Sequence, residues 1–330
     1  MSAVPSQVTV ANRAAPASSR RWMPDRRMIW TAVVLLVLPL LLPNNFALDI
    51  AIRIAITAVA AIGLNILMGF AGQVSIGHAA FVAVGAYGSA IGTARFGWNP
   101  VVTLVAATAF SSLLAWLLAK AILRLRGHAL TIATLGLGVI ASMILVNEVT
   151  WTGGPDGTSV GPMTFAGFGL RTLTQWYFAA AVILFIAIRL ALNLFDSPAG
   201  RAMRGLNSSE HAARTAGIDV GQYKAKAFVT SAAFASVSGS LMAHYIGFVS
   251  PSIASFTNSV ELVTMVVLGG RANVFGSVLG TALLEILPQL LGGLHGYESI
   301  LLGLILMATM IFLPLGLAPS LGRLFRRWSR

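Results

Sequence analysis

Residues 48–68 read LDIAIRIAITAVAAIGLNILM, a run of 21 residues in which Asp49 and Arg53 are the only charged side chains. The hydrocarbon core of a bilayer is about 30 Å thick, and a helix needs about 20 residues to cross it. The run therefore predicts a membrane-spanning helix. Asp49 and Arg53 are four residues apart, so they can form an ion pair on one face of its outer end.

Apolar blocks of similar length occupy most of the 330-residue chain. The other nine lie near 28–43, 79–95, 101–122, 129–149, 176–195, 226–249, 259–270, 274–292 and 299–317. Only 10% of the residues are charged, against roughly 25% in soluble domains, which argues against a soluble enzyme. We expect an all-α, polytopic membrane helical bundle of about ten transmembrane segments, with nine or eleven as alternatives. Block 259–270 is too short to span the hydrocarbon and predicts a half-helix or a re-entrant segment.

The formal charge of +12 would fit a nucleic-acid partner in a soluble protein. With ten crossings and a cytoplasmic N-terminus, however, nearly all the basic residues between the blocks and at the chain ends fall on the cytoplasmic side, as the positive-inside rule requires. These residues are Arg13, Arg20, Arg21, Arg26, Arg27, Lys120, Arg124, Arg126, Arg201, Arg204, Arg214, Lys224, Lys226, Arg271, Arg323, Arg326, Arg327 and Arg330. Both termini are therefore expected to be cytoplasmic, and no nucleic acid is needed.

The chain has no cysteine, so thiolate metal sites and thiol nucleophiles are excluded. It also lacks a P-loop, H-E-x-x-H and G-x-S-x-G. We therefore expect no metal, no bound cofactor and no enzymatic reaction. Residues 1–27 predict a disordered basic cytoplasmic tail, residues 28–320 one membrane domain, and residues 321–330 a second basic tail.

The polar stretch 196–225, called the coupling loop below, contains the start signals of two short helices. Ser197 can cap the first, with Pro198 at its first position. The second can begin after Ser208 or Ser209, with Glu210 in its first turn, and can end at Gly217. About eight residues are too few for a helix that is stable alone in water, so it needs a docking surface. That surface is either the bundle or a cytoplasmic partner.

Ionisable side chains within or beside the apolar blocks are candidates for a translocation pathway, because charge in a membrane is costly. They are His78, Glu148, His244, Glu261 and Glu285. The alternative for each is a hydrogen-bonded group that locks helices together. Glu261 ranks first because it lies on the short block, and interrupted helices commonly line substrate cavities.

Two further features concern packing and the outer surface. Small residues four apart predict close helix packing within the bundle, with a dimer face as the alternative. The pairs are Gly85/Ser89, Gly88/Gly92 and Gly276/Gly280. The turn TGGPDG at 152–157 includes Gly153 and Gly154 on the outer side. It could gate a pathway, receive a partner or be an ordinary connector.

Short strings along the chain carry a resemblance to a known family. They are GLNIL (63–67), GQVSIGHAAF (72–81), GAY (85–87), ATLG (133–136), TGGPDG (152–157), SPAGRA (197–202), Ala212-Ala213 with Gly217-Ile218 and Tyr223-Lys224, GFVSP (247–251) and VVLGG (266–270). In this order and spacing the chain closely resembles the LivM-type permease of branched-chain amino acid ABC importers, over nearly all of its length after residue 28.

The resemblance implies a multi-pass permease subunit in the bacterial cytoplasmic (inner) membrane. Its implied partners are a homologous LivH-type permease, two cytoplasmic ATPase subunits that use ATP, and a periplasmic or lipid-anchored binding protein. The second helix of the coupling loop would dock on an ATPase through Ser209, Glu210, Ala212, Ala213 and Gly217, although Glu210 stands one place earlier than in many relatives.

The implied cargo is leucine, isoleucine, valine or a similar amino acid, with urea, short amides or aromatic acids as alternatives within the family. Candidate pathway or gate residues are Gln73, Ser75, His78, Thr134, Gly153, Gly154 and Glu261. A stand-alone, ion-coupled secondary transporter is the alternative from another class, with Glu148, Glu261 and Glu285 as ion sites.

Overall fold

The structure is a computed structural model that describes residues 26–42, 44–122, 127–165 and 168–291, with isolated positions between 303 and 320. Its long helices are α1 (Arg26–Leu41), α2 (Asn45–Asn65), α3 (Ala79–Ala94), α4 (Pro100–Ile122), α5 (His128–Asn147), α7 (Leu173–Asp196), α10 (Val220–Ile246), α11 (Phe256–Gly269) and α12 (Val274–Leu291). Nine of the ten expected apolar blocks thus coincide with a helix. The tenth, 299–317, lies largely outside the described residues, as do both basic tails.

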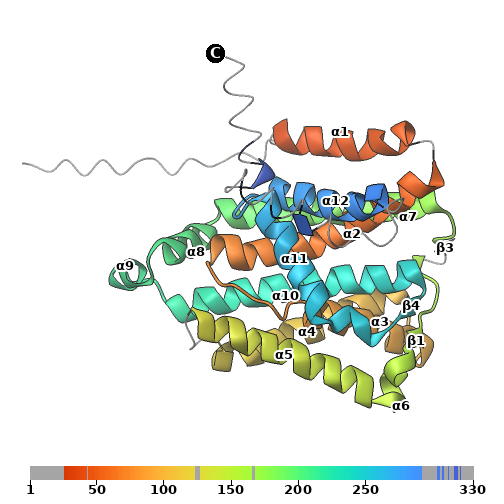
Figure 1. The fold of residues 1–330 in the computed structure, drawn as a ribbon, viewed down its shortest axis with the longest axis horizontal. Helices are drawn as coiled ribbons and strands as arrows, with labels where there is room; N and C mark the ends of the chain where they lie inside the picture. Colours follow the sequence, from red (N-terminus) through yellow and green to blue (C-terminus); the bar gives the residue numbers. More distant parts are fainter. Residues whose placement is uncertain are drawn as a thin grey trace, which may run out of the picture.

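Short elements connect these helices. They are the π-helix η1 (Ile66–Phe70), α6 (Val149–Thr152), η2 (Gly154–Asp156), β1 (Thr158–Ser159), β2 (Thr164–Phe165), β3 (Phe168–Gly169), α8 (Pro198–Ser208), α9 (Glu210–Thr215), β4 (Phe248–Val249) and η3 (Pro251–Ala254). In Figure 1, α8 and α9 lie at one end of the bundle, whereas α6, β1 and β4 lie at the opposite end.

The centre of the bundle is built on α2 and α10. From residue 51 to residue 65, α2 is almost continuously buried, and α10 packs against α2, α3 and α4. The buried side chains of α10 include Ser231, Ser236, Ser238 and Ser240. Ser231, Ser238 and Ser240 form hydrogen bonds with His78, Ile56 and Ser89 of other segments, so contact with protein on several sides supplies partners for most of these hydroxyl groups.

The outer helices have the reverse pattern, with large apolar side chains on the surface. Exposed examples are Val105, Phe110 and Trp116 of α4, Ile132 and Ile140 of α5, and Val182 and Ile186 of α7. Within the described ranges, five helices are long and apolar enough to cross a membrane, namely Asn45–Phe70, Pro100–Ala121, His128–Asn147, Leu173–Asp196 and Val274–Leu291. These features confirm a helical membrane bundle, while the count of ten crossings stays a prediction.

Small residues set the distance between α3 and α10. A Cβ atom on Gly85 would lie 2.0 Å from the carbonyl oxygen of Ser236, and one on Gly239 would lie 1.9 Å from that of Val82. The absence of a side chain at each glycine therefore allows the backbone of the other helix to approach closely. Gly276 and Gly280 meet α11 in the same way. The expected close packing is thus intramolecular.

Basic residues gather at the end of the bundle that carries α8 and α9, namely Arg201, Arg204, Arg214, Lys224 and Lys226 on α8, α9 and the start of α10. The turn that contains Arg271 lies beside Asn65 and Gly69, and Gly69 contacts α8. Arg95 and Arg171 lie at the other end, at the close of α3 and before α7. The cytoplasmic location of α8 and α9 stays a prediction. Arg124 and Arg126 lie outside the described residues.

Candidate functional site

The segment 71–78, called the irregular segment below, interrupts the helical bundle between η1 and α3. It begins with Gly72 at φ +67°, a left-handed conformation that glycine adopts without strain. At the same end, the side chain of Asn207 in α8 donates a 2.8 Å hydrogen bond to the carbonyl of Gly69. The irregular segment therefore starts where the coupling loop touches the bundle.

Three of the predicted pathway residues, Gln73, Ser75 and His78, lie on the irregular segment and are almost fully buried. The Nε2 atom of His78 is 2.9 Å from the hydroxyl of Ser231. Both amide atoms of Gln73, the hydroxyl of Ser75 and Nδ1 of His78 have no hydrogen-bond partner among the described residues. Buried polar atoms are usually satisfied, so this segment forms an unusual polar seam through an apolar interior.

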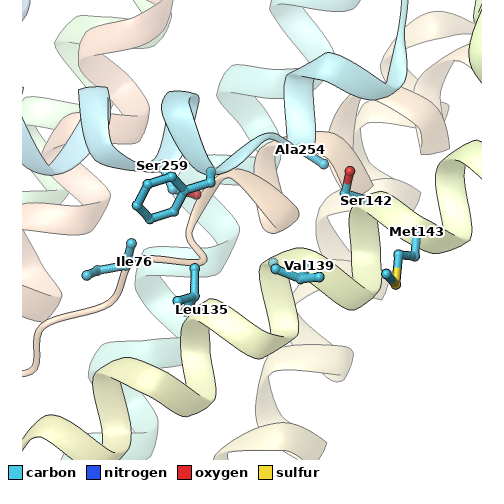
Figure 2. A pocket seen from close by; sticks show the side chains of 9 residues that line it. Ile76, Leu135, Val139, Ser142, Met143, Ala254 and Ser259 are labelled. Carbon is cyan, nitrogen blue, oxygen red and sulfur yellow. The ribbon is translucent and has the colours of Figure 1, made fainter.

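Thr134 of α5 holds the middle of the irregular segment. Its hydroxyl accepts a 3.2 Å hydrogen bond from the backbone N–H of Ile76, and a Cβ atom on Gly77 would lie 1.8 Å from the Thr134 carbonyl. Beside this contact lies an apolar cavity of about 280 Å³. In Figure 2, Leu135, Val139 and Met143 line it along α5, facing Ile76 and Ser259.

The beginnings of α3 and α11 meet at this point. The backbone N–H of Ala79 donates a 3.2 Å hydrogen bond to the hydroxyl of Ser259. Ser255 caps α11 by accepting from the N–H of Asn258. With 14 residues, α11 is about 21 Å long, less than the hydrocarbon thickness. The short helix expected from 259–270 is therefore present, and Ser259 of its first turn lies against the start of α3.

A larger cavity of about 420 Å³ lies on the other side of this junction, toward the end that carries β4. We call it the outer cavity. Its polar lining comprises Arg53, Thr57, Ser238, Ser250, Ser252, Asn258, Glu261 and Glu285. The hydroxyl of Thr57 donates to a Glu285 carboxylate oxygen over 3.1 Å, and the predicted Asp49–Arg53 ion pair is present at 2.9 Å. Opposite charges therefore meet inside the apolar bundle.

The predicted outer residues Gly153 and Gly154 lie away from the irregular segment. They have φ values of +80° and +61°, and a Cβ atom on Gly153 would lie 1.9 Å from the carbonyl of Gly157. The strand that follows, β1, pairs antiparallel with β4, so Thr158 faces Val249. The 152–157 turn is therefore a rigid reversal attached to the rim of the outer cavity.

The coupling loop folds as two capped helices. Ser197 accepts from the N–H of Gly200, and Ser209 accepts from that of Ala212. At its end, α9 has Gly217 at φ +77°, while the N–H of Ile218 returns to the carbonyl of Ala213 over 3.0 Å. The helix has six residues rather than about eight, because the last turn closes in this left-handed cap.

The bundle supplies one of the docking surfaces that α9 needs. Ala213 is buried with Leu206 and Val220, and Lys224 of α10 forms an ion pair with Glu210. Ala213 is buried and Glu210 is half-buried, whereas the other residues of α9, Ala212 among them, are exposed, as is Gly217 after it. Thus α9 presents a small, partly basic surface on the end of the bundle opposite β4.

The chain matches the family model described as the branched-chain amino acid transport system permease component over residues 46–313. The chain belongs to this family. The high-affinity branched-chain amino acid permease LivM of Escherichia coli is 33% identical over 319 residues, covering 87% of this chain and 74% of that protein. LivM of Salmonella typhimurium is 32% identical over 297 residues, covering 83% and 70%. No solved structure matches the chain. The resemblance to LivM-type permeases is confirmed, and the chain is a multi-pass membrane transport protein.

Within this permease, the predicted pathway residues fall into separate groups. Gln73, Ser75, His78 and Thr134 cluster on the irregular segment and its α5 contact, whereas Glu261 faces the outer cavity on the far side of Ala79. Glu148 lies exposed at the end of α5, and its side chain lines neither of these cavities. Among the described residues, no three His, Asp or Glu side chains converge in a way that could hold a metal ion.

The sequence reasoning did not name the cavity residues Thr57, Ser238 and Asn258. A signal for Thr57 was present, because Asp49, Arg53 and Thr57 recur every four residues and so share one face of α2. No such signal marked Ser238 and Asn258, since Ser238 is one of four serines in α10 and Asn258 stands between Thr257 and Ser259 at the polar start of α11.

Proposed function

We propose that this chain is a permease subunit of an ABC importer for branched-chain or related amino acids, located in the bacterial cytoplasmic membrane. ATP hydrolysis on separate subunits drives the transport. The family and the names of the two LivM relatives support the transport class and the cargo. Urea, short amides and aromatic acids are the alternative cargoes.

The proposed assembly contains this chain, a homologous LivH-type permease, two cytoplasmic ATPase subunits and a periplasmic or lipid-anchored binding protein. The exposed apolar faces of α4, α5 and α7 provide surface for lipid and for the second permease. Since the chain carries no P-loop, the nucleotide is bound by the ATPase subunits.

The observation that carries the proposal is the attachment of the coupling loop to the bundle at two points. The Glu210–Lys224 ion pair connects α9 to the start of α10. The hydrogen bond from Asn207 connects α8 to Gly69, immediately before the irregular segment. A partner that displaces α9 therefore moves both the central helix and the segment on which Gln73, Ser75 and His78 lie.

In this mechanism, ATP binding draws the ATPase subunits together and carries α9 with them. The bundle then changes between outward-open and inward-open packings, which is a shift of population between two states. The outer cavity represents the outward side, because it opens toward β4. The irregular segment closes the path toward α8.

Proteoliposomes that contain the purified complex test this function. With binding protein, leucine and ATP, the complete complex is expected to accumulate leucine, and the chain alone is expected to transport none. A stand-alone ion-coupled transporter would show the opposite result, namely uptake by the chain alone that an uncoupler abolishes and ATP does not change.

Gly217 provides a sharper test of the coupling role. Alanine at φ +77° costs about 1 kcal/mol, and β-branched valine costs more, so Gly217→Ala should reduce ATP-driven uptake and Gly217→Val should abolish it. Gly205→Ala is the matched control, since Gly205 is helical and a Cβ atom on it would lie 4.0 Å from its nearest neighbour. An intact Gly217→Val complex with unchanged uptake would contradict the coupling assignment.

A further inference from the structure

The outer cavity combines a polar side with an apolar side. Arg53, Glu261 and Glu285 supply its charges, and Met242, Leu262 and Met265 contribute apolar surface. Its volume of about 420 Å³ falls within the range of small-molecule sites. Five long helices, α2, α3, α10, α11 and α12, contribute side chains together with β4 and η3. The cavity opens to the surface of the chain, where Phe248 and Glu261 are exposed.

The charges in this cavity do not balance within the described chain. Arg53 is already paired with Asp49, and Asp49 also accepts a hydrogen bond from Tyr245. Among the described residues, Glu285 has only the hydroxyl of Thr57 as a hydrogen-bond donor. Glu261 is exposed to the cavity and forms no hydrogen bond or ion pair with any residue that the structure describes.

An unpaired carboxylate at membrane depth is expensive unless a cation approaches it. Glu261 stands in the second turn of α11 and lines the same cavity as Glu285. Arg53 also lies within electrostatic range of Glu285, but it is paired with Asp49, so the two glutamates together leave negative charge for a further positive group. Met242, Leu262 and Met265 form an apolar wall beside these carboxylates. A compact ammonium group attached to an aliphatic chain satisfies both surfaces.

We propose that Glu261, assisted by Glu285, binds the α-ammonium group of the transported amino acid in the outer cavity, with the aliphatic side chain against Met242, Leu262 and Met265. This inference rests on the proposed function and narrows its cargo. A zwitterionic aliphatic amino acid fits the site, whereas urea and neutral amides lack the cation that Glu261 requires.

Direct binding to the assembled permease–ATPase complex, without the binding protein, tests the site. Three probes of similar shape are compared by calorimetry, namely leucine, 4-methylpentanoate, which lacks the ammonium group, and 3-methylbutylamine, which lacks the carboxylate. We expect leucine and 3-methylbutylamine to bind and 4-methylpentanoate not to bind. Glu261→Gln is expected to weaken leucine binding about tenfold or more, because a charge-assisted hydrogen bond is lost.

Glu148→Gln is the matched control, since it makes the same chemical change at an exposed site outside the cavity. It should bind leucine as the unmodified complex does. The site is overturned if the unmodified complex binds no leucine, if Glu261→Gln binds leucine normally, or if 4-methylpentanoate binds as tightly as leucine.

Two further outcomes also overturn the ammonium site and identify another partner for Glu261. Dissociation of the Glu261→Gln complex in the absence of ligand would show an ion pair between subunits. Leucine binding that requires sodium chloride, and that choline chloride does not support, would show a site for an inorganic cation. The proposed function fails separately, if the unmodified complex with binding protein and ATP imports no branched-chain amino acid.

Discussion

The hydrogen bond from Asn207 to Gly69 is the feature of this permease whose role can be measured most directly. It joins α8 to the last turn before the irregular segment, over 2.8 Å. The contact is tight, because a Cβ atom on Gly72 would lie only 2.5 Å from the Asn207 side-chain oxygen. If movement of the coupling loop moves the irregular segment, removal of this bond should weaken the coupling between them without unfolding either part.

The expected size follows from the energetics of one hydrogen bond. A typical bond contributes about 0.5–1.5 kcal/mol net, and about 1.4 kcal/mol corresponds to a tenfold change in an equilibrium. Asn207→Ala should therefore lower the number of leucine molecules imported per ATP hydrolysed by about 2- to 10-fold. Asn207→Asp keeps the size of the side chain but removes the donor, so it should lower the ratio at least as much.

The assay measures uptake and ATP hydrolysis in the same proteoliposomes, with binding protein present. Ser208→Ala is the matched control, because Ser208 is adjacent and its hydroxyl bonds within α8, to the Arg204 carbonyl. A role of this bond in coupling is excluded if Asn207→Ala retains the unmodified ratio, or if Ser208→Ala lowers it equally. Loss of ATP hydrolysis together with uptake would also count against it, since the bond would then support assembly rather than coupling.

Two further predictions concern the stability of the bundle, measured by thermal unfolding of the purified complex. Asn65→Leu removes three hydrogen bonds, two to the turn before α12 and one to Ser277 within it. It should lower the free energy of unfolding by about 2 kcal/mol or more. Asn147→Leu loses one exposed bond within its own helix and should lower it far less. Gly239→Ala places a Cβ atom 1.9 Å from the Val82 carbonyl and should cost at least about 1–3 kcal/mol. Gly221→Ala in the same helix, where the nearest atom is 3.4 Å away, should be neutral or stabilising, and equal effects of the two alanines would contradict the packing argument.

Local signals in the sequence predicted local structure well. The apolar blocks predicted the helices, and Ser197, Ser209 and Gly217 predicted the limits of α8 and α9 because capping depends on residues close in sequence. The ion pair of Asp49 with Arg53 is likewise confirmed, since its partners are one helical turn apart.

Contacts between distant segments were not predictable in the same way. In a soluble helix the apolar stripe identifies the buried face, but the helices of this bundle are apolar on nearly all faces. The sequence therefore could not show that Glu261 and Glu285 share a cavity with Arg53, or that β1 pairs with β4. Nor could it show that Gln73 and Ser75 are buried without partners among the described residues, because burial depends on the surrounding elements rather than on residue type.

The polar groups of this bundle lie where protein, rather than lipid, surrounds the backbone. Lipid offers no hydrogen bonds, so irregular backbone at membrane depth is stable only where protein surrounds it. In this permease α3 and α11 begin beside each other, and the Ala79–Ser259 hydrogen bond joins them. One junction thus exposes backbone and side-chain polar groups to two cavities, while the outer helices stay apolar. The proposed binding of a polar cargo beside this junction follows the same rule, because an interrupted helix is costly where lipid surrounds it.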